Sequence, residues 1–349
     1  MPLTLGLQSG GERNAADKSF LIWLYIFNQG DSNAITATPQ TLFTLYALYM
    51  KKLILLIFTF HGFYNLGAQV SDSIKLSNAS LYYEIKGEGL PILLLSGGPG
   101  VSSKQLAPVR DSLSSKYKCI LFDQRGTGES HTSPLDSSTI NLKQSVRDIS
   151  TLLEKLKIGR VTIVGHSWGA MLAVNFAIAH PTQINKLVLI GSGVLAFSDF
   201  DIQQDNIYAR SSSAEKEYAA RLEDSMKTSK SRSLAVARAK QFLRLIIYDA
   251  KKTDSIFEEI RKAACNQNMT ILMYQDLQKI NYNVKNNIGS LNFPTLVICG
   301  RQDPIGLFPS IQLKELNNKF NIVWVEKSGH FPWLENPESF YREVFKFLQ

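Results

Sequence analysis

The stretch VTIVGHSWG, residues 161–169, decides the fold. Its first four residues are typical of a buried strand, and the apolar segment Met171 to Ile178 that follows is typical of a helix. Between them, Gly165 and Gly169 flank Ser167 in the pattern G-x-S-x-G. A sharp turn from strand to helix needs small flanking residues, because neighbouring backbone approaches the serine closely. The pattern in this context predicts a serine exposed at the end of a strand.

Buried strands and amphipathic helices alternate on both sides of this turn. Short apolar runs predict strands, a 3.6-residue period predicts a helix from Leu142 to Leu156, and a closing helix runs from Pro337 to Leu348. An opening antiparallel pair is expected from Ile74–Leu76 and Leu81–Ile85. The other expected strands are Pro91–Leu95, Cys119–Phe122, Val161–Val164, Leu187–Ile190, Thr295–Cys299 and Asn321–Val325. This alternation predicts an α/β fold with a mostly parallel sheet and helices on both faces.

One long segment interrupts the alternation. From Leu195 to Asn286 the chain is charged, helical in period and without a strand signal. Because the segment follows a strand, it is expected to return over the serine as a helical cap, residues 195–286. The core would then consist of two parts, residues 73–194 and 287–349.

The N-terminal residues differ from the rest of the chain. Residues 1–49 show no clear period, and a basic start at Met50 is followed by the apolar run Leu53 to Phe60. This pattern predicts a signal peptide, residues 50–68, and makes residues 1–49 a spurious upstream extension. The enzyme would then be exported, periplasmic or secreted, with no stable membrane span after removal of the signal. An N-terminal membrane anchor is the alternative, since Leu42 to Tyr49 is also apolar.

Composition excludes several classes of protein. The 349 residues are 44% hydrophobic and 19% charged, which is ordinary for a globular chain. The net charge of +8 is spread thinly, without the dense basic block that follows phosphates, so no nucleic-acid partner is expected. The three cysteines, Cys119, Cys265 and Cys299, have no metal-ligand spacing, so no metal site is expected. Their odd number argues against a complete disulfide framework and leaves one bridge open.

A serine hydroxyl needs a general base and a group that orients the base before it can act as a nucleophile. His330 follows the last expected strand, and Asp303 follows the strand before it. Both therefore lie at strand carboxyl ends, where catalytic groups gather in such sheets. The order Ser167, Asp303, His330 suits a catalytic triad with serine as nucleophile. Asp199 or Asp201 is the alternative acid.

An oxyanion hole requires backbone N–H groups that point at the developing charge. One donor is expected from Trp168, directly after the serine. The other is expected from the glycine-rich loop 97–100, which follows a buried strand. Gly98 is expected to be this donor, because Pro99, the next residue in the loop, has no N–H.

Three motifs together resemble one known family. GGPG at 97–100, DQRGTGES at 123–130 and GHSWG at 165–169 resemble the prolyl iminopeptidase branch of the α/β hydrolases. The resemblance extends from about Ser73 to the end of the chain, apart from the insertion. It implies the α/β-hydrolase fold, a Ser/Asp/His triad, no cofactor, and removal of an N-terminal residue, typically proline, from peptides.

The sequence departs from that family at two places. Ser96 stands where the family has histidine before Gly-Gly-Pro-Gly, and the insertion lacks the tryptophan of a Trp-Glu pair that helps to hold the substrate amine. In the family the Asp-Gln-Arg-Gly turn is mainly architectural. Asp123 and Arg125 are therefore given no catalytic step, although Asp123 is a second candidate for an acid near the pocket.

Three functions are compatible with these residues. The first is an exported aminopeptidase that releases N-terminal residues from short peptides through an acyl-enzyme. The second is a carboxylesterase or lactonase that acts on small acyl substrates with the same triad. The third, a non-catalytic binding protein on a hydrolase scaffold, is disfavoured by the intact triad. An aminopeptidase needs a carboxylate for the substrate ammonium, and the cap acids Glu215, Glu217 and Glu223 are candidates.

Overall fold

The apolar runs of the sequence pair into a nine-stranded sheet in this computed structural model, which describes residues 69–229 and 231–349. The predicted upstream extension 1–49, the signal peptide 50–68 and the alternative anchor lie outside the described residues. Within the described ranges, no helix combines the length and the apolar character that a membrane span requires. The strands are β1 (Val70–Lys75), β2 (Ala79–Lys86), β3 (Pro91–Leu95), β4 (Lys118–Phe122), β5 (His131–Thr132), β6 (Val161–His166), β7 (Ile184–Ile190), β8 (Thr295–Gly300) and β9 (Asn321–Val325).

The strand order is β1-β2-β4-β3-β6-β7-β8-β9, with β5 paired to β2 at the side. The pairs β1–β2, β2–β4 and β2–β5 are antiparallel, and every other pair in the sheet, from β4 to β9, is parallel. The mostly parallel sheet and the antiparallel opening pair predicted from the sequence are therefore confirmed, and so is the α/β-hydrolase fold.

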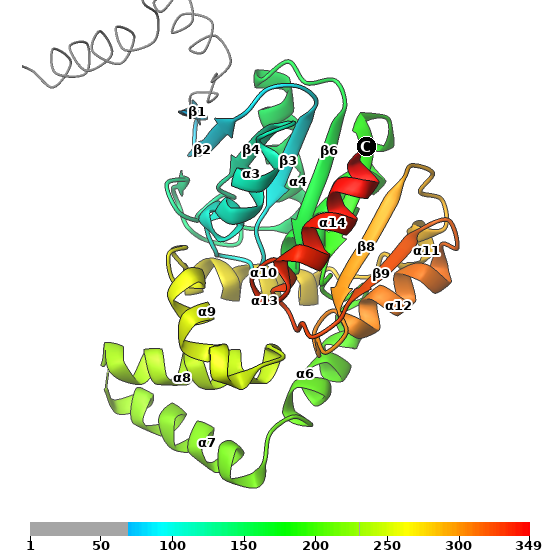
Figure 1. Cartoon of the computed structure of the whole chain (residues 1–349). Coiled ribbons are helices and arrows are strands. Elements are labelled where there is room, and N and C mark those ends of the chain that lie inside the picture. Colours follow the sequence, from blue (N-terminus) through cyan, green and yellow to red (C-terminus); the bar gives the residue numbers. More distant parts are fainter. Residues whose placement is uncertain (1–68, 230) are drawn as a thin grey trace, which may run out of the picture. The chain divides into compact units, whose positions relative to one another are not determined.

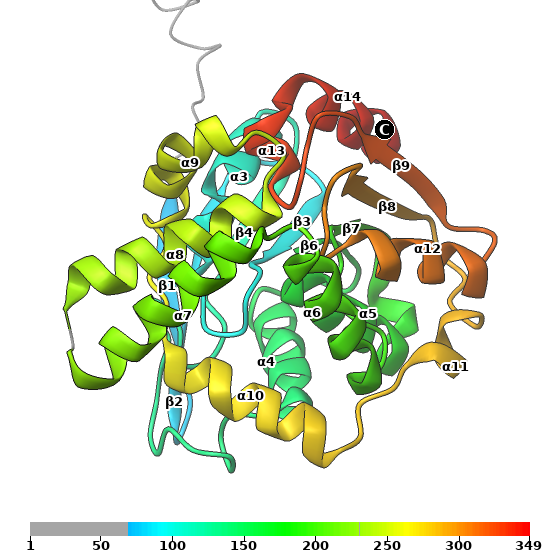
Figure 2. The ribbon, with the colours of Figure 1, turned by 90° about the horizontal axis from the view of Figure 1, so that it is seen from below.

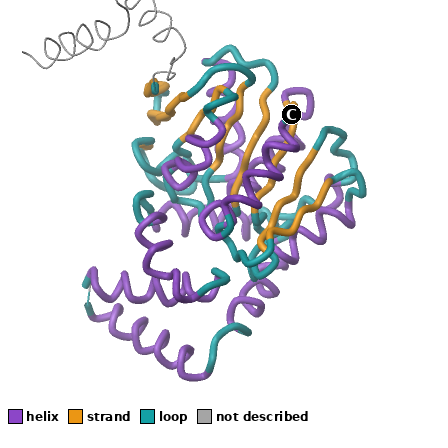
Figure 3. Tube along the Cα trace, viewed as in Figure 1, coloured by secondary structure: helices purple, strands orange, loops and turns teal. Residues whose placement is uncertain are grey.

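Helices cover both faces of this sheet (Figures 1 and 3). The side chains of the parallel strands β3, β4 and β6 to β9 alternate between two apolar clusters, as the two-residue period of a strand requires. Leu93 and Leu95 of β3 face one cluster, whereas Ile92 and Leu94 face the other. The first cluster includes α4 (Leu142–Lys155), α5 (Trp168–Ala179) and α12 (Leu307–Leu316), and the second includes α3 (Ala107–Leu113) and α14 (Pro337–Leu348).

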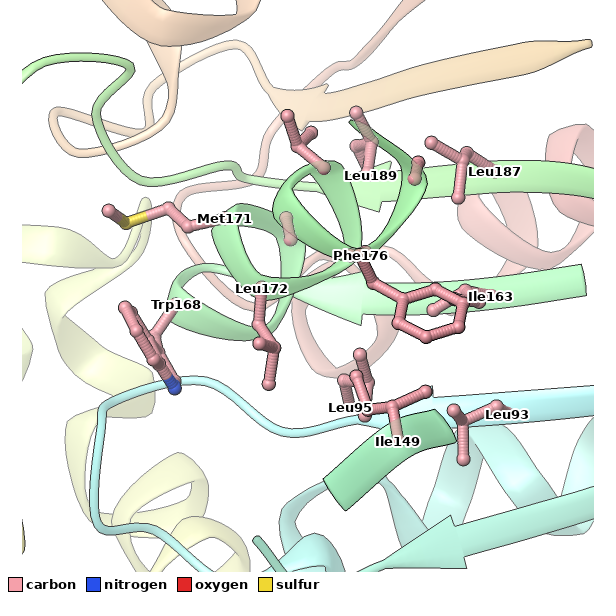
Figure 4. Packing of buried hydrophobic residues seen from close by; sticks show 14 of the residues in the cluster. Leu93, Leu95, Ile149, Ile163, Trp168, Met171, Leu172, Phe176, Leu187 and Leu189 are labelled. Carbon is pink, nitrogen blue, oxygen red and sulfur yellow. The ribbon is translucent and has the colours of Figure 1, made fainter. Parts of the chain in front are cut away.

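Helix α5 is buried on nearly all sides, which sets the position of the turn before it. Its side chains pack against the sheet and against α4 (Figure 4). Buried residues of the inserted segment belong to the same cluster. The sequence of α5 is apolar throughout except for Asn175, as expected of a helix with little solvent-exposed surface. The Asn175 amide donates to the Met171 carbonyl and to the Tyr282 hydroxyl.

The segment predicted to be a cap is helical. Its helices are α6 (Phe200–Tyr208), α7 (Ser213–Thr228), α8 (Arg232–Ile246), α9 (Thr253–Ile260), α10 (Gln267–Lys279) and α11 (Lys285–Ile288). Figures 1 and 2 show α7 and α8 side by side as the outermost pair. The Ser102 N–H donates to the Ala264 carbonyl at 2.9 Å, and the His330 N–H donates to the Ile246 carbonyl at 2.8 Å. The inserted helices therefore contact the loops that leave the carboxyl ends of the parallel strands.

Helix α10 belongs to the core rather than to the outer pair of helices. Met269, Met273 and Leu277, four residues apart, are buried in the same cluster as α4 and α5. In addition, the Leu142 N–H at the start of α4 donates to the Asp276 carboxylate at 2.8 Å. This packing anchors the returning end of the insertion on the sheet.

Candidate active site

Ser167 occupies the turn between β6 and α5 in a strained conformation. Its φ of 53° and ψ of −115° lie outside the regions that residues with a side chain prefer. The backbone leaves no space for a Cβ at Gly165, which adjoins Gly169, or at Gly169, which adjoins the Leu95 carbonyl. The Ser167 N–H donates to the Ile190 carbonyl of β7 at 2.9 Å, which holds the turn against the sheet.

His330 and Asp303 meet at the carboxyl ends of β8 and β9. The distance from His330 Nδ1 to Asp303 Oδ2 is 2.9 Å, and both residues are at least 96% buried. Asp303 Oδ1 accepts the Ile305 N–H at 2.9 Å, so both carboxylate oxygens have a donor. Because a carboxylate only accepts, His330 Nδ1 carries a hydrogen and neutral imidazole leaves Nε2 unprotonated. His330 and Ser167 line the same cavity, without a hydrogen bond between them in the described chain.

Gly191 makes room for this pair. It follows β7 with a φ of 48°, in the left-handed region. A Cβ at this position would lie 2.8 Å from Asp303 Oδ2 and 3.3 Å from His330 Nδ1. The sequence did not indicate Gly191, because its loop is far from Asp303 and His330 along the chain and contacts them only in the folded protein.

The two candidate oxyanion donors lie at the same cavity as Ser167. Gly98 and Trp168 both line the cavity that contains the serine. The neighbouring Gly97 N–H already donates to Gln105 Oε1 at 2.7 Å. Over residues 69–229 and 231–349, no hydrogen bond uses the Gly98 N–H, and the Trp168 N–H lies in the first turn of α5, where no helical partner exists. Both N–H groups are available to an oxygen bound at Ser167.

His166 supports the loop that carries His330. Its Nε2 donates to the His330 carbonyl at 3.0 Å, and the two imidazole centroids lie 4.6 Å apart. Burial, together with the nearby His330 ring, lowers the pKa of His166 well below its usual value, so the imidazole is neutral. Its Nδ1 lies 3.2 Å from Oε1 of Gln105.

Glu335 holds the same loop from the other side. Its Oε2 accepts the N–H groups of Gly329 at 3.0 Å and Tyr248 at 2.7 Å, and its Oε1 accepts the Phe331 N–H at 3.1 Å. Burial raises the pKa of Glu335, although these three N–H groups act in the opposite direction. The carboxylate therefore ties both neighbours of His330 to the segment after α8. The sequence did not indicate this residue, because its partners come from separate segments.

The cavity above Ser167 is apolar. Its volume is about 360 Å³, and Val101, Met171, Ile305 and Phe331 contribute to its wall from the core. The inserted helices contribute Phe200, Phe242, Leu243, Ile246, Phe257 and Ile260. No aspartate, glutamate, lysine or arginine is found among the described residues that line it. The polar groups apart from the candidate catalytic residues are those of Gln105, His166, Gln203 and Tyr274.

The alternative acids lie elsewhere and have other partners. Asp199 forms an ion pair with Lys285 at 2.9 Å, and Asp123 accepts the N–H groups of Ser103 and Glu129. Asp201 is exposed and lines a surface pocket next to the cavity. None of the three lines the cavity that contains Ser167.

The cap acids named as candidates for the substrate ammonium are also outside the cavity. Glu215 caps α7 and pairs with Arg244, and Glu217 pairs with Arg221. Glu223 pairs with Arg238 on the neighbouring helix α8 at 2.7 Å. Glu215 and Glu223 thus join α7 to α8, whereas Glu217 and its partner lie one turn apart on the exposed surface of α7.

Arg125, in the turn after β4, has a structural contact. It forms two hydrogen bonds with Asp148 of α4, at 2.9 and 2.6 Å, in a buried pair. Such a fork fixes the turn 123–126 against α4.

Comparisons with known proteins place this geometry in context. A family profile described as "alpha/beta hydrolase fold" matches residues 91–337. A proline iminopeptidase of Heyndrickxia coagulans is 25% identical over 272 residues, covering 76% of this chain and 93% of that protein. A 2-hydroxy-6-oxo-6-phenylhexa-2,4-dienoate hydrolase of Comamonas testosteroni is 25% identical over 303 residues, covering 81% and 95%. An α/β-fold hydrolase structure from Bacillus anthracis superposes with a TM-score of 0.66 at 17% identity, covering 80% of this chain and 99% of that one.

The comparison with the Heyndrickxia coagulans enzyme contradicts the predicted location of the protein. The prediction of an exported enzyme, periplasmic or secreted, is wrong when it is compared with this relative. The alignment covers 93% of the relative's own length. The prediction depended on an apolar run of about eight residues after a basic pair. Runs of that length are also typical of ordinary buried strands, so the pattern does not discriminate between the two. We assign no compartment to the protein.

Proposed function

Because the chain belongs to the α/β-hydrolase fold family, we propose that it is a serine hydrolase that cleaves esters of small, uncharged, apolar acyl groups. The observation that carries this proposal is the cavity of about 360 Å³ at Ser167, whose lining contains no charged carboxylate or ammonium among the described residues. An apolar acyl chain gains about 0.8 kcal/mol for each methylene that it buries in such a site.

The proposed reaction uses Ser167 as nucleophile. His330 takes the hydroxyl proton on Nε2 while Ser167 Oγ attacks the carbonyl carbon, and Asp303 stabilises the resulting imidazolium. The N–H groups of Gly98 and Trp168 stabilise the oxyanion of the tetrahedral intermediate. His330 then donates the proton to the leaving alcohol, which departs and leaves an acyl-enzyme. A water molecule, deprotonated by His330, attacks this ester and releases the carboxylic acid and Ser167.

A free substrate amine does not suit this cavity. A buried ammonium without a partner costs several kcal/mol, and the lining offers neutral amides, a phenol and imidazoles but no carboxylate. The ester or lactone function, which was the second hypothesis from the sequence, therefore takes precedence over the aminopeptidase function.

An aminopeptidase of the prolyl iminopeptidase type is the second candidate. It is supported by the similarity to a proline iminopeptidase and by Asp201, which lines an adjoining pocket. That pocket shares Phe200, Gln203, Phe242 and Tyr274 with the cavity, so these four side chains form the wall between them. In this second function, Asp201 would receive the ammonium beyond that wall.

A panel of chromogenic substrates separates the two functions. The values of kcat/KM are measured for nitrophenyl butyrate, for proline and alanine nitroanilides with a free amine, and for their N-acetylated forms. We expect the butyrate ester to be the best substrate, and acetylation to change the anilide rates by less than about threefold.

The opposite pattern supports the aminopeptidase. It consists of rapid cleavage of the free-amine anilides, a loss of about 100-fold on acetylation, and a similar loss in Asp201→Asn. An enzyme that turns over none of these substrates would point instead to a binding protein on the hydrolase scaffold.

A further inference from the structure

Gln124 lies between the two segments that carry the candidate oxyanion donors. It is the second residue of the Asp-Gln-Arg-Gly turn after β4, and it is 2% exposed. Its Oε1 accepts the indole N–H of Trp168 at 2.7 Å. Its Nε2 donates to the Ser96 carbonyl at 3.2 Å and lies 3.5 Å from the Ser96 hydroxyl. A single amide thus spans from the start of α5 to the end of β3.

The partner on the β3 side leads directly to Gly98. The Ser96 hydroxyl donates to the Val101 carbonyl at 2.8 Å, and the Val101 N–H donates to the Gly98 carbonyl at 3.0 Å. These two bonds close the loop 96–101 on itself, so the loop moves as one piece. A shift of the Ser96 carbonyl therefore shifts the Gly98 N–H.

The partner on the α5 side is equally restrained. The Trp168 side chain is 3% exposed and packs in the core cluster beside Leu172. Figure 4 shows the indole nitrogen directed toward the loop that follows β3. Because Trp168 supplies its own backbone N–H to the candidate oxyanion hole, the indole contact helps to fix the direction of that N–H.

We infer that Gln124 is a positioning residue for the oxyanion hole, which sets the separation of the Gly98 and Trp168 N–H groups. The inference rests on the proposed serine-hydrolase function of the same site. It gives the Asp-Gln-Arg-Gly turn a part in the reaction, although Gln124 touches no reacting atom. On the loop, the residue that Gln124 contacts is Ser96, which is also a position where this chain departs from the family that it resembles.

Displaced donors weaken the transition state more than the bound substrate, since an oxyanion exists only after attack. Loss of a single oxyanion donor lowers kcat by about 10²–10³. Gln124→Leu keeps both N–H groups but removes the hydrogen bonds that fix the distance between them. We therefore expect a smaller fall in kcat, about 10- to 100-fold, with KM nearly unchanged. Trp168→Phe removes the same hydrogen bond from the other side and should have a similar effect.

The decisive readout is the affinity for a transition-state analogue. An alkyl trifluoromethyl ketone adds to Ser167 and places its oxygen in the oxyanion hole whatever leaving group the enzyme prefers. We expect the inhibition or dissociation constant of the ketone to rise by the same factor as kcat/KM falls in Gln124→Leu and Trp168→Phe. The double variant should be no worse than the more impaired single variant, because both substitutions remove the same hydrogen bond between Gln124 and the Trp168 indole.

Matched variants distinguish positioning from stability. Asn317→Leu removes another buried amide, which bridges the Ile288 and Leu291 carbonyls at 2.9 Å each, remote from the cavity lining. It should lower the melting temperature without changing kcat or ketone affinity. Gln124→Glu has the same shape, accepts the indole N–H but cannot donate to Ser96, and provides the test if Gln124→Leu does not fold.

Reduced thermal stability with unchanged kcat/KM and ketone affinity in the Gln124 variants would overturn the inference. Because ketone binding is measured independently of turnover, a wild-type enzyme that fails to hydrolyse esters but binds the ketone tests Gln124 all the same. Failure of the proposed function is thus distinguished from failure of this inference.

Discussion

Replacing Asp303 by asparagine exchanges one carboxylate oxygen of the Asp303–His330 pair for an amide nitrogen. In the wild type, Oδ1 accepts the Ile305 N–H and Oδ2 accepts Nδ1–H of His330, each at 2.9 Å. The Ile305 donor is a fixed backbone group, so the amide oxygen of asparagine remains on it. The amide nitrogen then faces His330 Nδ1, which must lose its hydrogen to accept the new donor.

The consequence is the wrong tautomer of His330. Its hydrogen moves to Nε2, which can no longer take the proton of Ser167. The corresponding exchange in a serine protease lowers kcat by about 10⁴, equal to about 5.5 kcal/mol in the activation barrier. Asp303 is 1% exposed, so solvent is not available to restore the original tautomer. We expect the full loss of about 10⁴ in kcat, with KM changed by only a few fold.

The assay is the initial rate on nitrophenyl butyrate from pH 5 to 9, with folding checked by circular dichroism. Asp199→Asn is the matched control, because it makes the same exchange at a carboxylate that is 4% exposed and paired with Lys285. The control should keep its activity within about threefold. An Asp303→Asn enzyme that retains more than a tenth of the wild-type kcat would refute the argument and point to Asp199, Asp201 or Asp123.

Two further predictions concern the effect of pH on stability and the length of the substrate's acyl chain. The pKa of His166 is lower in the folded protein than the usual histidine value of about 6.5. When the pH is below that usual value, the His166 side chain therefore takes up a proton as the protein unfolds. His166 therefore contributes stability above that pH, which is lost as the pH falls toward the folded-state pKa. Urea unfolding should show this loss, at most about 1.4 kcal/mol per pH unit, in the wild type and not in His166→Asn. Phe242 lines the cavity, the adjoining pocket that contains Asp201, and a second pocket lined by Glu223 and Arg238. Phe242→Ala should let a long acyl chain bury about two further methylenes beyond this wall, which would raise the ratio of kcat/KM for decanoate over butyrate esters about 10-fold. An unchanged ratio would contradict the wall assigned to Phe242.

The strands were readable from the sequence because the parallel sheet is buried on both faces. The predicted run Pro91–Leu95 coincides with β3, and Cys119–Phe122 differs from β4 by one residue. The two-residue strand β5 was not predicted, because two residues cannot show an alternation. The position of α10 in the core had a signal in the four-residue spacing of Met269, Met273 and Leu277, but helical period alone does not say which layer a helix joins.

The site was readable only where local pattern determines position. The serine turn and the residues after β8 and β9 follow from strand ends, and the structure brings Asp303 and His330 into contact. The contacts of Gln124 and Glu335 join segments far apart in the chain, so no spacing indicates them. The apolar lining of the cavity was equally hidden, because it depends on which face each inserted helix turns inward. The expected amine-binding acid was taken from chemistry and resemblance, and the packing of the helices left it elsewhere.

The most direct test of this account is covalent labelling of the nucleophile. The purified enzyme is treated with a fluorophosphonate or with nitrophenyl diethyl phosphate, and the modified peptide is identified by mass spectrometry. We predict one modification per chain, on Ser167, with loss of esterase activity in proportion to labelling. Ser167→Ala should remain folded, unlabelled and without turnover. Labelling at another residue, or an active Ser167→Ala enzyme, would contradict the claim that Ser167 is the nucleophile.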